Sequence, residues 1–190
     1  MKHKGCGHLS DEYLVEKIVT GDQPDLYEVL FERYQKRVLE KCYSLVRNYE
    51  LAGELTEDIL SKAFEKLGSF KGNSSFGSWL YSITYNHCID YLRLKKKLHY
   101  PTWNRQNELP EIIDETEEDN TEMQSERLQK LMNLLHTEEK ALLLMKYQDD
   151  LSLKQIAEAM RLTEGAVKMR MKRSKARLLY LYKSLYGSYN

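Results

Sequence analysis

The sequence contains few of the residues that interrupt helices. Its 190 residues include only three prolines and nine glycines, and long segments repeat apolar side chains at helical spacing. It has no apolar run long enough to span a bilayer and no secretory leader, so we expect a soluble, cytoplasmic protein. The predicted fold is all-α, with two small helical domains joined by a flexible acidic linker.

Motifs that carry chemistry are equally scarce. The three cysteines, Cys6, Cys42 and Cys88, are odd in number and lack CxxC spacing, which argues against a disulfide framework or a zinc knuckle. There is no phosphate-binding glycine loop, no HExxH and no evident pairing of a nucleophile with a base. We therefore expect a protein that is not an enzyme and that needs neither a metal nor another cofactor.

Charge is balanced overall but unevenly distributed. Lys and Arg total 29, as do Asp and Glu. Nine of the acids lie between Asn107 and Glu126, without one Lys or Arg, which leaves the rest of the chain at +9. Such asymmetry is typical of a nucleic-acid binder with an acidic insert. The stretch lacks a hydrophobic period, so we predict a linker over 98–125 between folded parts at 10–97 and 126–190.

The stretch from Leu151 to Leu178 is the most informative and predicts a helix-turn-helix. A first helix over 153–160 is followed by a turn and by Thr163, a good N-cap for a second helix. Val167 and Met171, four residues apart, would anchor that second helix inward. Many such motifs have glycine in the turn, where a positive φ is needed and where any other residue costs energy. This chain has Arg161 there.

The outward side of the second helix is basic. It carries Lys168, Met169, Lys172 and Arg173, and in a helix-turn-helix these positions meet base edges in the major groove. Between Gly165 and the C-terminus there are seven basic residues and no acid. A solvated helix face usually mixes both signs, so duplex DNA explains this strip better.

A second block, residues 70–97, combines aromatic, small polar and basic side chains. After a loop at 68–75, a helix is predicted from Phe76 to Lys97. Its core side would carry Leu80, Ile83, His87 and Tyr91. Its other side would carry Trp79, Ser82, Asn86, Asp90 and Arg93.

That other side has the composition of a surface for unpaired bases. Stacking on an aromatic ring contributes about 1–3 kcal/mol per base, although an aromatic stripe is often simply core, so the role of Trp79 stays open. The loop is expected to form a pocket for an extruded base. It contributes Asn73, Ser74 and Ser75. Phosphates of the adjoining duplex would be held by Arg93, Lys95, Lys96 and Lys97.

The remaining N-terminal residues predict a helical bundle. Ser10 would cap a short helix that ends near Gly21, and amphipathic helices are predicted over 25–47 and 51–67. The helix over 51–67 has an outward side that is rich in charge. This side carries Glu54, Glu57, Asp58, Lys62, Glu65 and Lys66.

The two blocks, in this order, resemble the group IV, or extracytoplasmic-function (ECF), sigma factors of bacterial RNA polymerase. The first block carries FERYQKRVLEKCYSLV, AGELTEDILSKAFEKL and FKGNSSFGSWLYSITYNHCIDYLRLKKK, and the second carries LHTEEKALLLMKYQDDLSLKQIAEAM and TEGAVKMRMKRSKARL. The resemblance covers about residues 24–97 and 126–180. It implies that 10–97 is sigma region 2 and 126–190 is region 4.

The resemblance also implies a function. Region 4 would read the promoter −35 element through Lys168, Met169, Lys172 and Arg173. Its phosphate contacts would be Thr163, Arg170, Lys175 and Arg177. Region 2 would open the −10 element, with a flipped base captured by the loop from Asn73 to Phe76. The charged side of the 51–67 helix would dock on the polymerase clamp. The implied partners are core RNA polymerase, promoter DNA and, as is common in this class, an anti-sigma factor.

Two alternatives remain open from the residues alone. One is a dimeric helix-turn-helix transcriptional regulator in which 10–97 is a sensor or dimerisation bundle. The other is an adaptor whose bundle binds a protein partner and whose basic tail is incidental. The aromatic and basic block at 70–97 argues against the first, and the one-signed basic strip argues against the second.

Overall fold

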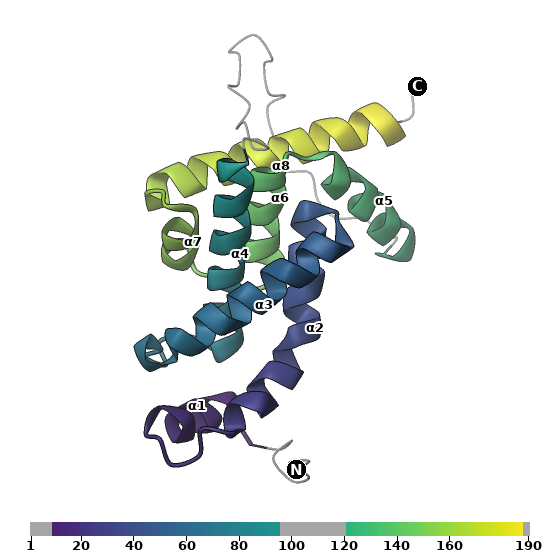
Figure 1. The fold of residues 1–190 in the computed structure, drawn as a ribbon. Coiled ribbons are helices and arrows are strands. Elements are labelled where there is room, and N and C mark those ends of the chain that lie inside the picture. The colour runs from purple at the N-terminus through teal and green to yellow at the C-terminus, as the bar shows by residue number, and fades with distance from the viewer. Residues whose placement is uncertain (1–8, 96–120, 188–190) are drawn as a thin grey trace.

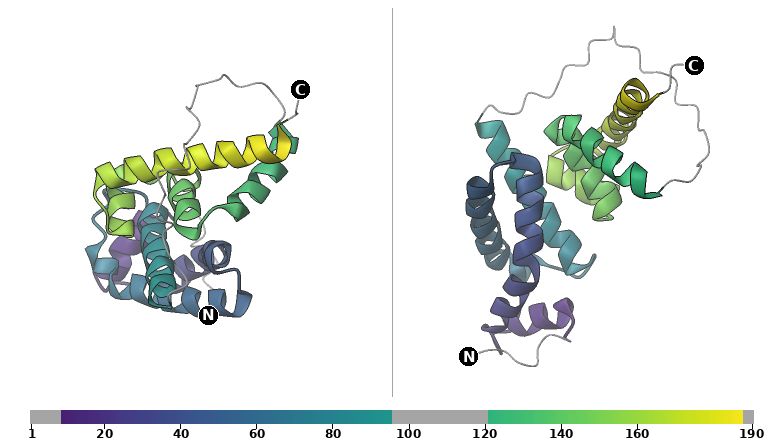
Figure 2. Two further views of the ribbon diagram at one scale, coloured as in Figure 1. Left: turned by 90° about the horizontal axis from the view of Figure 1, so that it is seen from above. Right: turned by 90° about the vertical axis from the view of Figure 1, so that its right-hand side faces the viewer.

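The protein is a bundle of α-helices in two units. The computed structural model describes residues 9–95 and 121–187, and this part of the chain contains no β-strand. The N-terminal unit and the C-terminal unit lie side by side, as the right-hand view of Figure 2 shows. The predicted all-α class with two helical domains is confirmed. The predicted linker lies mostly outside the described residues, and helix α5 already begins at Thr121.

The N-terminal unit is built from four helices and one 3₁₀ turn (Figure 1). These are α1 (Asp11–Val19), α2 (Leu26–Val46), α3 (Tyr49–Glu65), η2 (Leu67–Ser69) and α4 (Phe76–Leu94). Side-chain caps mark three of the starts, because the oxygens of Ser10, Asn48 and Ser75 accept hydrogen bonds from backbone N–H groups in the first turn. The predicted Ser10 cap is confirmed, and α4 ends three residues before the predicted Lys97.

The C-terminal unit contains the predicted helix-turn-helix. Its elements are α5 (Thr121–Leu134), α6 (Thr137–Leu143), η3 (Leu144–Gln148), α7 (Leu153–Met160) and α8 (Glu164–Tyr186). Helix α7 has the predicted bounds. The π-helical turn η3 ends where Asp149 N donates to Leu144 O at 3.1 Å, and π-turns often occur at functional positions. None of the helices in the described part has the length and apolarity that crossing a membrane requires.

Buried apolar side chains form one cluster that runs through both units. Leu30, Val38, Ile59 and Leu80 belong to it in the N-terminal unit, and further members come from α6, α7 and α8. Helix α4 of the first unit packs beside α7 of the second (Figure 1). The structure thus packs the two units together, with α4 in contact with helices of both.

Candidate nucleic-acid interface

The turn of the helix-turn-helix is formed by a residue in the left-handed conformation. Arg161 has φ 55° and ψ 49°, and its N–H bonds to the carbonyls at the end of α7. This is the position where the sequence lacks the usual glycine, and left-handed geometry costs a non-glycine residue about 1 kcal/mol. Thr163 then caps α8, with Oγ1 accepting from Ala166 N at 3.2 Å. The predicted Thr163 cap is confirmed, and the turn adopts a positive φ without glycine.

Helix α8 divides into an inward side and an outward side, as predicted. Val167 and Met171 are buried against α7. Lys168, Met169 and Lys172 are exposed, with Met169 at 53%, whereas Arg173 is half-buried. The outward side therefore presents two lysines and a thioether in open solvent, with one guanidinium at their edge.

The α8 side chains that were predicted to contact phosphates have interaction partners within the protein. Arg170 Nη1 lies 3.0 Å from Glu138 Oε2, and Arg177 Nη1 lies 3.7 Å from Glu139 Oε2. Both acids are buried at the start of α6. Lys175 Nζ lies over the ring of Tyr147, 4.9 Å from its centroid. Since these partners lie in other helices of the unit, the sequence of α8 alone did not show the pairings.

The loop before α4 is organised by serines and an aromatic cluster. Ser75 Oγ accepts from Ser78 N at 3.1 Å and donates to Ser78 Oγ at 2.9 Å. Phe76 is buried, and its ring packs near Phe70 and Trp79 at 5.7 and 5.5 Å. The predicted pocket residue Ser75 is thus a helix cap, and Phe76 is a core residue in this arrangement.

The loop side chains differ in exposure. Asn73 and Ser75 are exposed, whereas Ser74 is half-buried, with Ser74 Oγ donating to Ser75 O at 3.4 Å. Trp79 is half-buried, with its ring centroid 5.5 Å from that of Phe70. Asn73 and Ser75 are therefore the accessible side chains of the predicted pocket.

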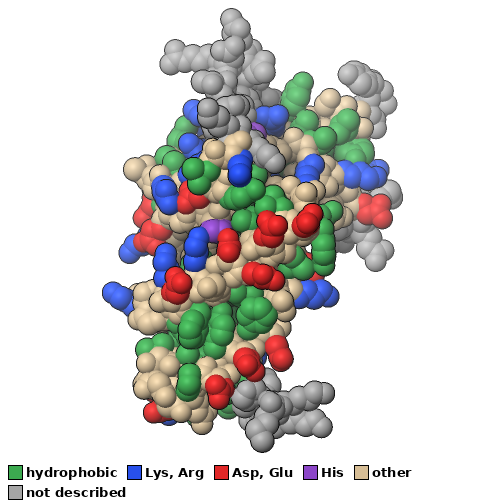
Figure 3. All heavy atoms as spheres, in the orientation of Figure 1, with side chains coloured by type: hydrophobic (Ala, Val, Ile, Leu, Met, Phe, Trp, Pro, Cys, Tyr) green, Lys and Arg blue, Asp and Glu red, His purple; other side chains and the backbone are tan. Residues whose placement is uncertain are grey.

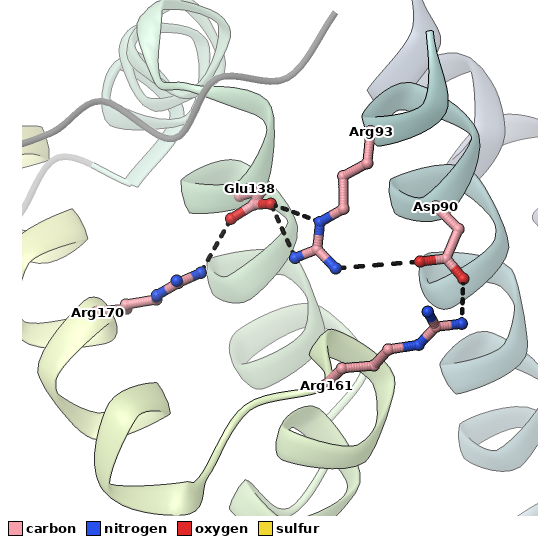
Figure 4. Close-up of polar contacts among 5 residues, drawn as sticks. All are labelled: Asp90, Arg93, Glu138, Arg161 and Arg170. Carbon is pink, nitrogen blue, oxygen red and sulfur yellow. Dashed lines mark hydrogen bonds and ion pairs between the residues drawn. The ribbon is translucent and has the colours of Figure 1, made fainter. Parts of the chain in front are cut away.

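The predicted base-facing side of α4 meets the other unit. Arg93 donates from Nε and Nη2 to Glu138 Oε1 at 3.1 and 2.9 Å. Asp90 Oδ2 accepts from Arg161 Nη2 at 2.6 Å. Figure 4 shows the chain of alternating charges that these residues form with Arg170. Asn86 is half-buried on the same helix.

The basic end of α4 is only partly described. Lys95 is exposed at the C-cap, with Nζ 5.8 Å from the centroid of the Tyr91 ring. The predicted phosphate contacts Lys96 and Lys97 lie outside the described residues. Lys95 therefore marks the point at which a basic surface would begin.

The charged side of α3 is open to solvent. It presents Glu54, Glu57, Asp58, Lys62 and Glu65, all exposed. In Figure 3, acidic side chains gather across the middle of the molecule, over α3. Lys62 Nζ lies 3.0 Å from His87 Nδ1, and burial followed by the charge of Lys62 lowers the pKa of that imidazole. The surface is predominantly acidic and suits a basic partner surface.

One polar cluster was missed from the sequence. Lys41 of α2 donates to Asp149 Oδ1 at 2.5 Å, and Tyr85 Oη of α4 donates to Asp149 Oδ2 at 2.7 Å. Burial, and then the Asp149 charge, raise the pKa of Tyr85 well above its ordinary value. A signal was present, because Lys41 lies three residues after Val38 on the buried stripe of α2. A charge at such a position needs a buried partner.

Family models for two sigma-70 domains match the chain in the order of its two units. The model described as Sigma-70 region 2 matches residues 30–98, and the one described as Sigma-70, region 4 matches 125–178. The chain belongs to the sigma-70 family and to its ECF class. Its α1–α4 unit contains region 2, and its α5–α8 unit contains region 4 with the helix-turn-helix.

Individual relatives agree with this assignment. The chain is 26% identical over 174 residues to the ECF RNA polymerase sigma factor SigW of Bacillus subtilis (strain 168), across 86% of this chain and 92% of that protein. Among solved structures, CnrH in complex with the cytosolic domain of CnrY has a TM-score of 0.59 at 18% identity, covering 92% and 98% of the two chains.

A second solved structure has the same fold. It is the sigma factor RpoE from Bartonella quintana in complex with the anti-sigma factor NepR, with a TM-score of 0.55 at 20% identity. It covers 83% of this ECF sigma factor and 96% of RpoE. At these identities the two structures support the fold of this chain.

Proposed function

We propose that this ECF sigma factor directs core RNA polymerase to promoters by reading two DNA elements with its two units. The observation that carries the proposal is the helix-turn-helix, whose α8 presents Lys168, Met169 and Lys172 outward while Val167 and Met171 hold it to α7. The proposed units are residues 10–97 and 126–190, and the proposed linker is 98–125. This division would let the polymerase set the distance between the unit that reads −10 and the unit that reads −35.

The α8 surface is proposed to read the −35 element in the major groove. Lys168, Lys172 and Arg173 have the donors that pair with guanine O6 and N7. Met169 is suited to the methyl group of thymine. Thr163, Arg170, Lys175 and Arg177 would contact phosphates, and the guanidinium of Arg170 would first exchange Glu138 for a phosphate, since both are bidentate oxygen acceptors.

Region 2 is proposed to capture the −10 element as single strand. Asn73 is exposed, and Ser74 and Trp79 are half-buried, so an unpaired base would form hydrogen bonds with the first two and stack on the third. Ser75 and Phe76 would support the loop as cap and core. The edge of the melted segment would meet Asn86, Asp90 and Arg93. The phosphates beyond it would meet Lys95, Lys96 and Lys97.

The exposed side of α3 is proposed to dock on the polymerase. Its Glu54, Glu57, Asp58, Lys62 and Glu65 are all solvent-exposed. Within the described residues, the side-chain contacts that docking would disturb are those of Asp58 and Lys62 with His87. An anti-sigma factor is a further proposed partner, since two solved structures of this fold are complexes with CnrY and with NepR.

No catalytic step is proposed for the chain itself. The free energy of strand opening would come from binding extruded bases and from the polymerase, because the site residues are donors, acceptors and rings without a nucleophile–base pair. Since polymerase and chromosome share one compartment in bacteria, the proposed site of action is the cytoplasm.

Run-off transcription with bacterial core RNA polymerase on a pooled promoter library tests this function. Start sites that share sequence at −35 and −10 should appear only when the chain is added. Absence of such start sites, with duplex binding by a stable dimer, would overturn the proposal and favour a helix-turn-helix regulator. The oligomeric state is measured by sedimentation on the same preparation.

A further inference from the structure

The side of α4 that the proposed function assigns to promoter DNA is covered in this structure by region 4. Asp90 and Arg93 point from α4 toward α6 and α7, and each has its closest partner in the other unit (Figure 4). Asn86, on the same helix, is half-buried. A strand of DNA and region 4 cannot occupy this side of α4 at the same time.

The contact is made by charges that are largely removed from water. Asp149, at the end of η3, has a side chain that is 4% exposed and that accepts from Lys41 and Tyr85 of region 2. The Lys41 side chain is itself 10% exposed. Buried ion pairs contribute little net stability compared with apolar packing, yet removing one partner is strongly unfavourable. Such a pair therefore specifies one arrangement of two surfaces.

Glu138 of region 4 binds arginines from both of the units that are proposed to read DNA. Its buried carboxylate accepts from Arg93 of α4 through Oε1 and from Arg170 of α8 through Oε2. Glu138 therefore binds one guanidinium from each unit, and each of these guanidinium groups is proposed to contact a DNA phosphate. Arg161, in the turn of the helix-turn-helix, adds a third link to Asp90 at 2.6 Å.

We propose that this arrangement is a closed state, in which Asp149, Glu138 and Arg161 latch region 4 onto the DNA-facing side of α4 until the two units separate. The inference rests on the proposed function for the identity of that side. It assigns Asp149, which has no proposed contact with DNA, the role of stabilising the closed state. Opening separates Lys41 from Asp149 and Arg93 from Glu138, which exposes two cations of region 2 and thereby favours DNA, while Arg170 keeps its partner Glu138 within region 4.

Substitution of Asp149 by Asn tests the latch, with Asp150→Asn as the matched control. Both changes remove one negative charge, and the two positions are adjacent, but Asp150 is exposed and has φ 50°, which asparagine tolerates. Each full-length chain is measured by small-angle X-ray scattering and by binding to a fluorescein-labelled mixed-sequence single strand and its duplex. Circular dichroism melts establish that each variant is folded.

We expect Asp149→Asn to increase the radius of gyration and to raise affinity for both probes about fivefold or more, the lower end of couplings between linked sites. Asp150→Asn should leave the radius unchanged and alter affinity little, because an exposed charge is screened by salt. Equal radii and equal affinities for the two folded variants would overturn the latch.

Arg161→Ala provides a second test that does not remove a buried group. It deletes a positive charge, which by itself weakens DNA binding, so a gain in affinity identifies opening. The matched control is Lys154→Ala, an exposed lysine on α7, which should bind no more tightly than wild type. Loss of affinity in both would contradict the latch. Run-off transcription by the wild-type chain reports separately on the proposed function, which fails if no promoter-directed transcript forms, whatever the radius.

Discussion

Arg93 of region 2 and Arg170 of region 4 bind opposite oxygens of one carboxylate, that of Glu138, at 2.9 and 3.0 Å. The Glu138 side chain is 4% exposed, whereas the two arginines are 33% and 23% exposed. The buried acid therefore depends on both cations for its solvation, while each arginine retains access to water. This asymmetry determines what a substitution at each position does.

Neutralising Glu138 should destabilise the fold. Glu138→Gln leaves two guanidinium groups with a neutral acceptor, but both can turn toward solvent, so we expect a loss of about 1–3 kcal/mol, less than for a fully enclosed pair. Urea unfolding of the full-length chain measures this loss. Glu126→Gln, at an exposed acid of α5, is the control and should stay within about 0.5 kcal/mol of wild type. Equal stability of both variants would show that Glu138 is not an organising charge.

The left-handed turn at Arg161 predicts a difference between two substitutions. Arg161→Gly and Arg161→Ala both lose the contact with Asp90, but only glycine adopts φ 55° without strain. We expect the glycine variant to be more stable than the alanine variant by about 1 kcal/mol. Paired urea titrations give this value directly. If the alanine variant is equally stable, the turn between α7 and α8 does not adopt the left-handed conformation in solution.

His87 predicts a specific dependence of stability on pH. Burial, and then the charge of Lys62, lower its pKa below the ordinary 6.5. The folded state therefore binds this proton less readily than the unfolded state, and the free energy of unfolding falls as the pH drops below 6.5 toward the lowered pKa. Well above 6.5 both states are neutral at this position and the effect disappears.

Replacing His87 should remove that part of the pH dependence. We expect His87→Gln to lose less stability than wild type between about pH 7.5 and about pH 5.5, a range that spans the ordinary histidine pKa. Chemical unfolding at the two values measures the difference. An identical loss in both chains would mean that His87 titrates equally in the folded and unfolded states.

Cys42 of α2 and Cys88 of α4 should be unreactive in the folded chain. Their Sγ atoms lie 3.6 Å apart and both side chains are fully buried. Contact with Cys42, and then burial, raise the pKa of the Cys88 thiol well above its ordinary value, whereas the contact with Cys88 lowers the pKa of Cys42. The two thiols are therefore protected by their exclusion from solvent, which keeps a reagent from reaching either sulfur. In a Cys6→Ser background, a thiol-reactive chromophore should label these two only after unfolding in urea. Rapid native labelling would contradict the packing of α2 on α4.

Local signals predicted much of the fold. Ser10, Thr163 and the apolar spacing on α7 depend on neighbours within a few residues, so the helix starts and the inward side of α8 followed from the sequence. The position of the turn at Arg161 also followed, but not its left-handed conformation, because a non-glycine residue there could equally have adjusted the turn. These features are set by short-range hydrogen bonds and by helical periodicity.

The two sides of α4 were predicted less well. Leu80 is buried as expected, but Ile83, His87 and Tyr91 are half-buried, and the core is instead completed by Tyr85 and its neighbours. The core-facing residues are Thr84, Tyr85, Cys88, Ile89 and Leu92. Helix α4 packs against both units, and the second of these lies far along the chain. Periodicity within one helix cannot reveal a partner of that kind, nor the pairing of Asp149 with Lys41.

The most direct test of the account is the promoter sequence that the chain selects with core polymerase, compared between wild type and Arg173→Ala. Arg173 lies at the edge of the outward side of α8, and its removal should relax selection at −35 by about 1–3 kcal/mol at one base pair while leaving the −10 preference intact. Sequencing of run-off products from one pooled library measures both elements together. Unchanged −35 selection, or a change confined to −10, would contradict the proposed placement of the two reading surfaces.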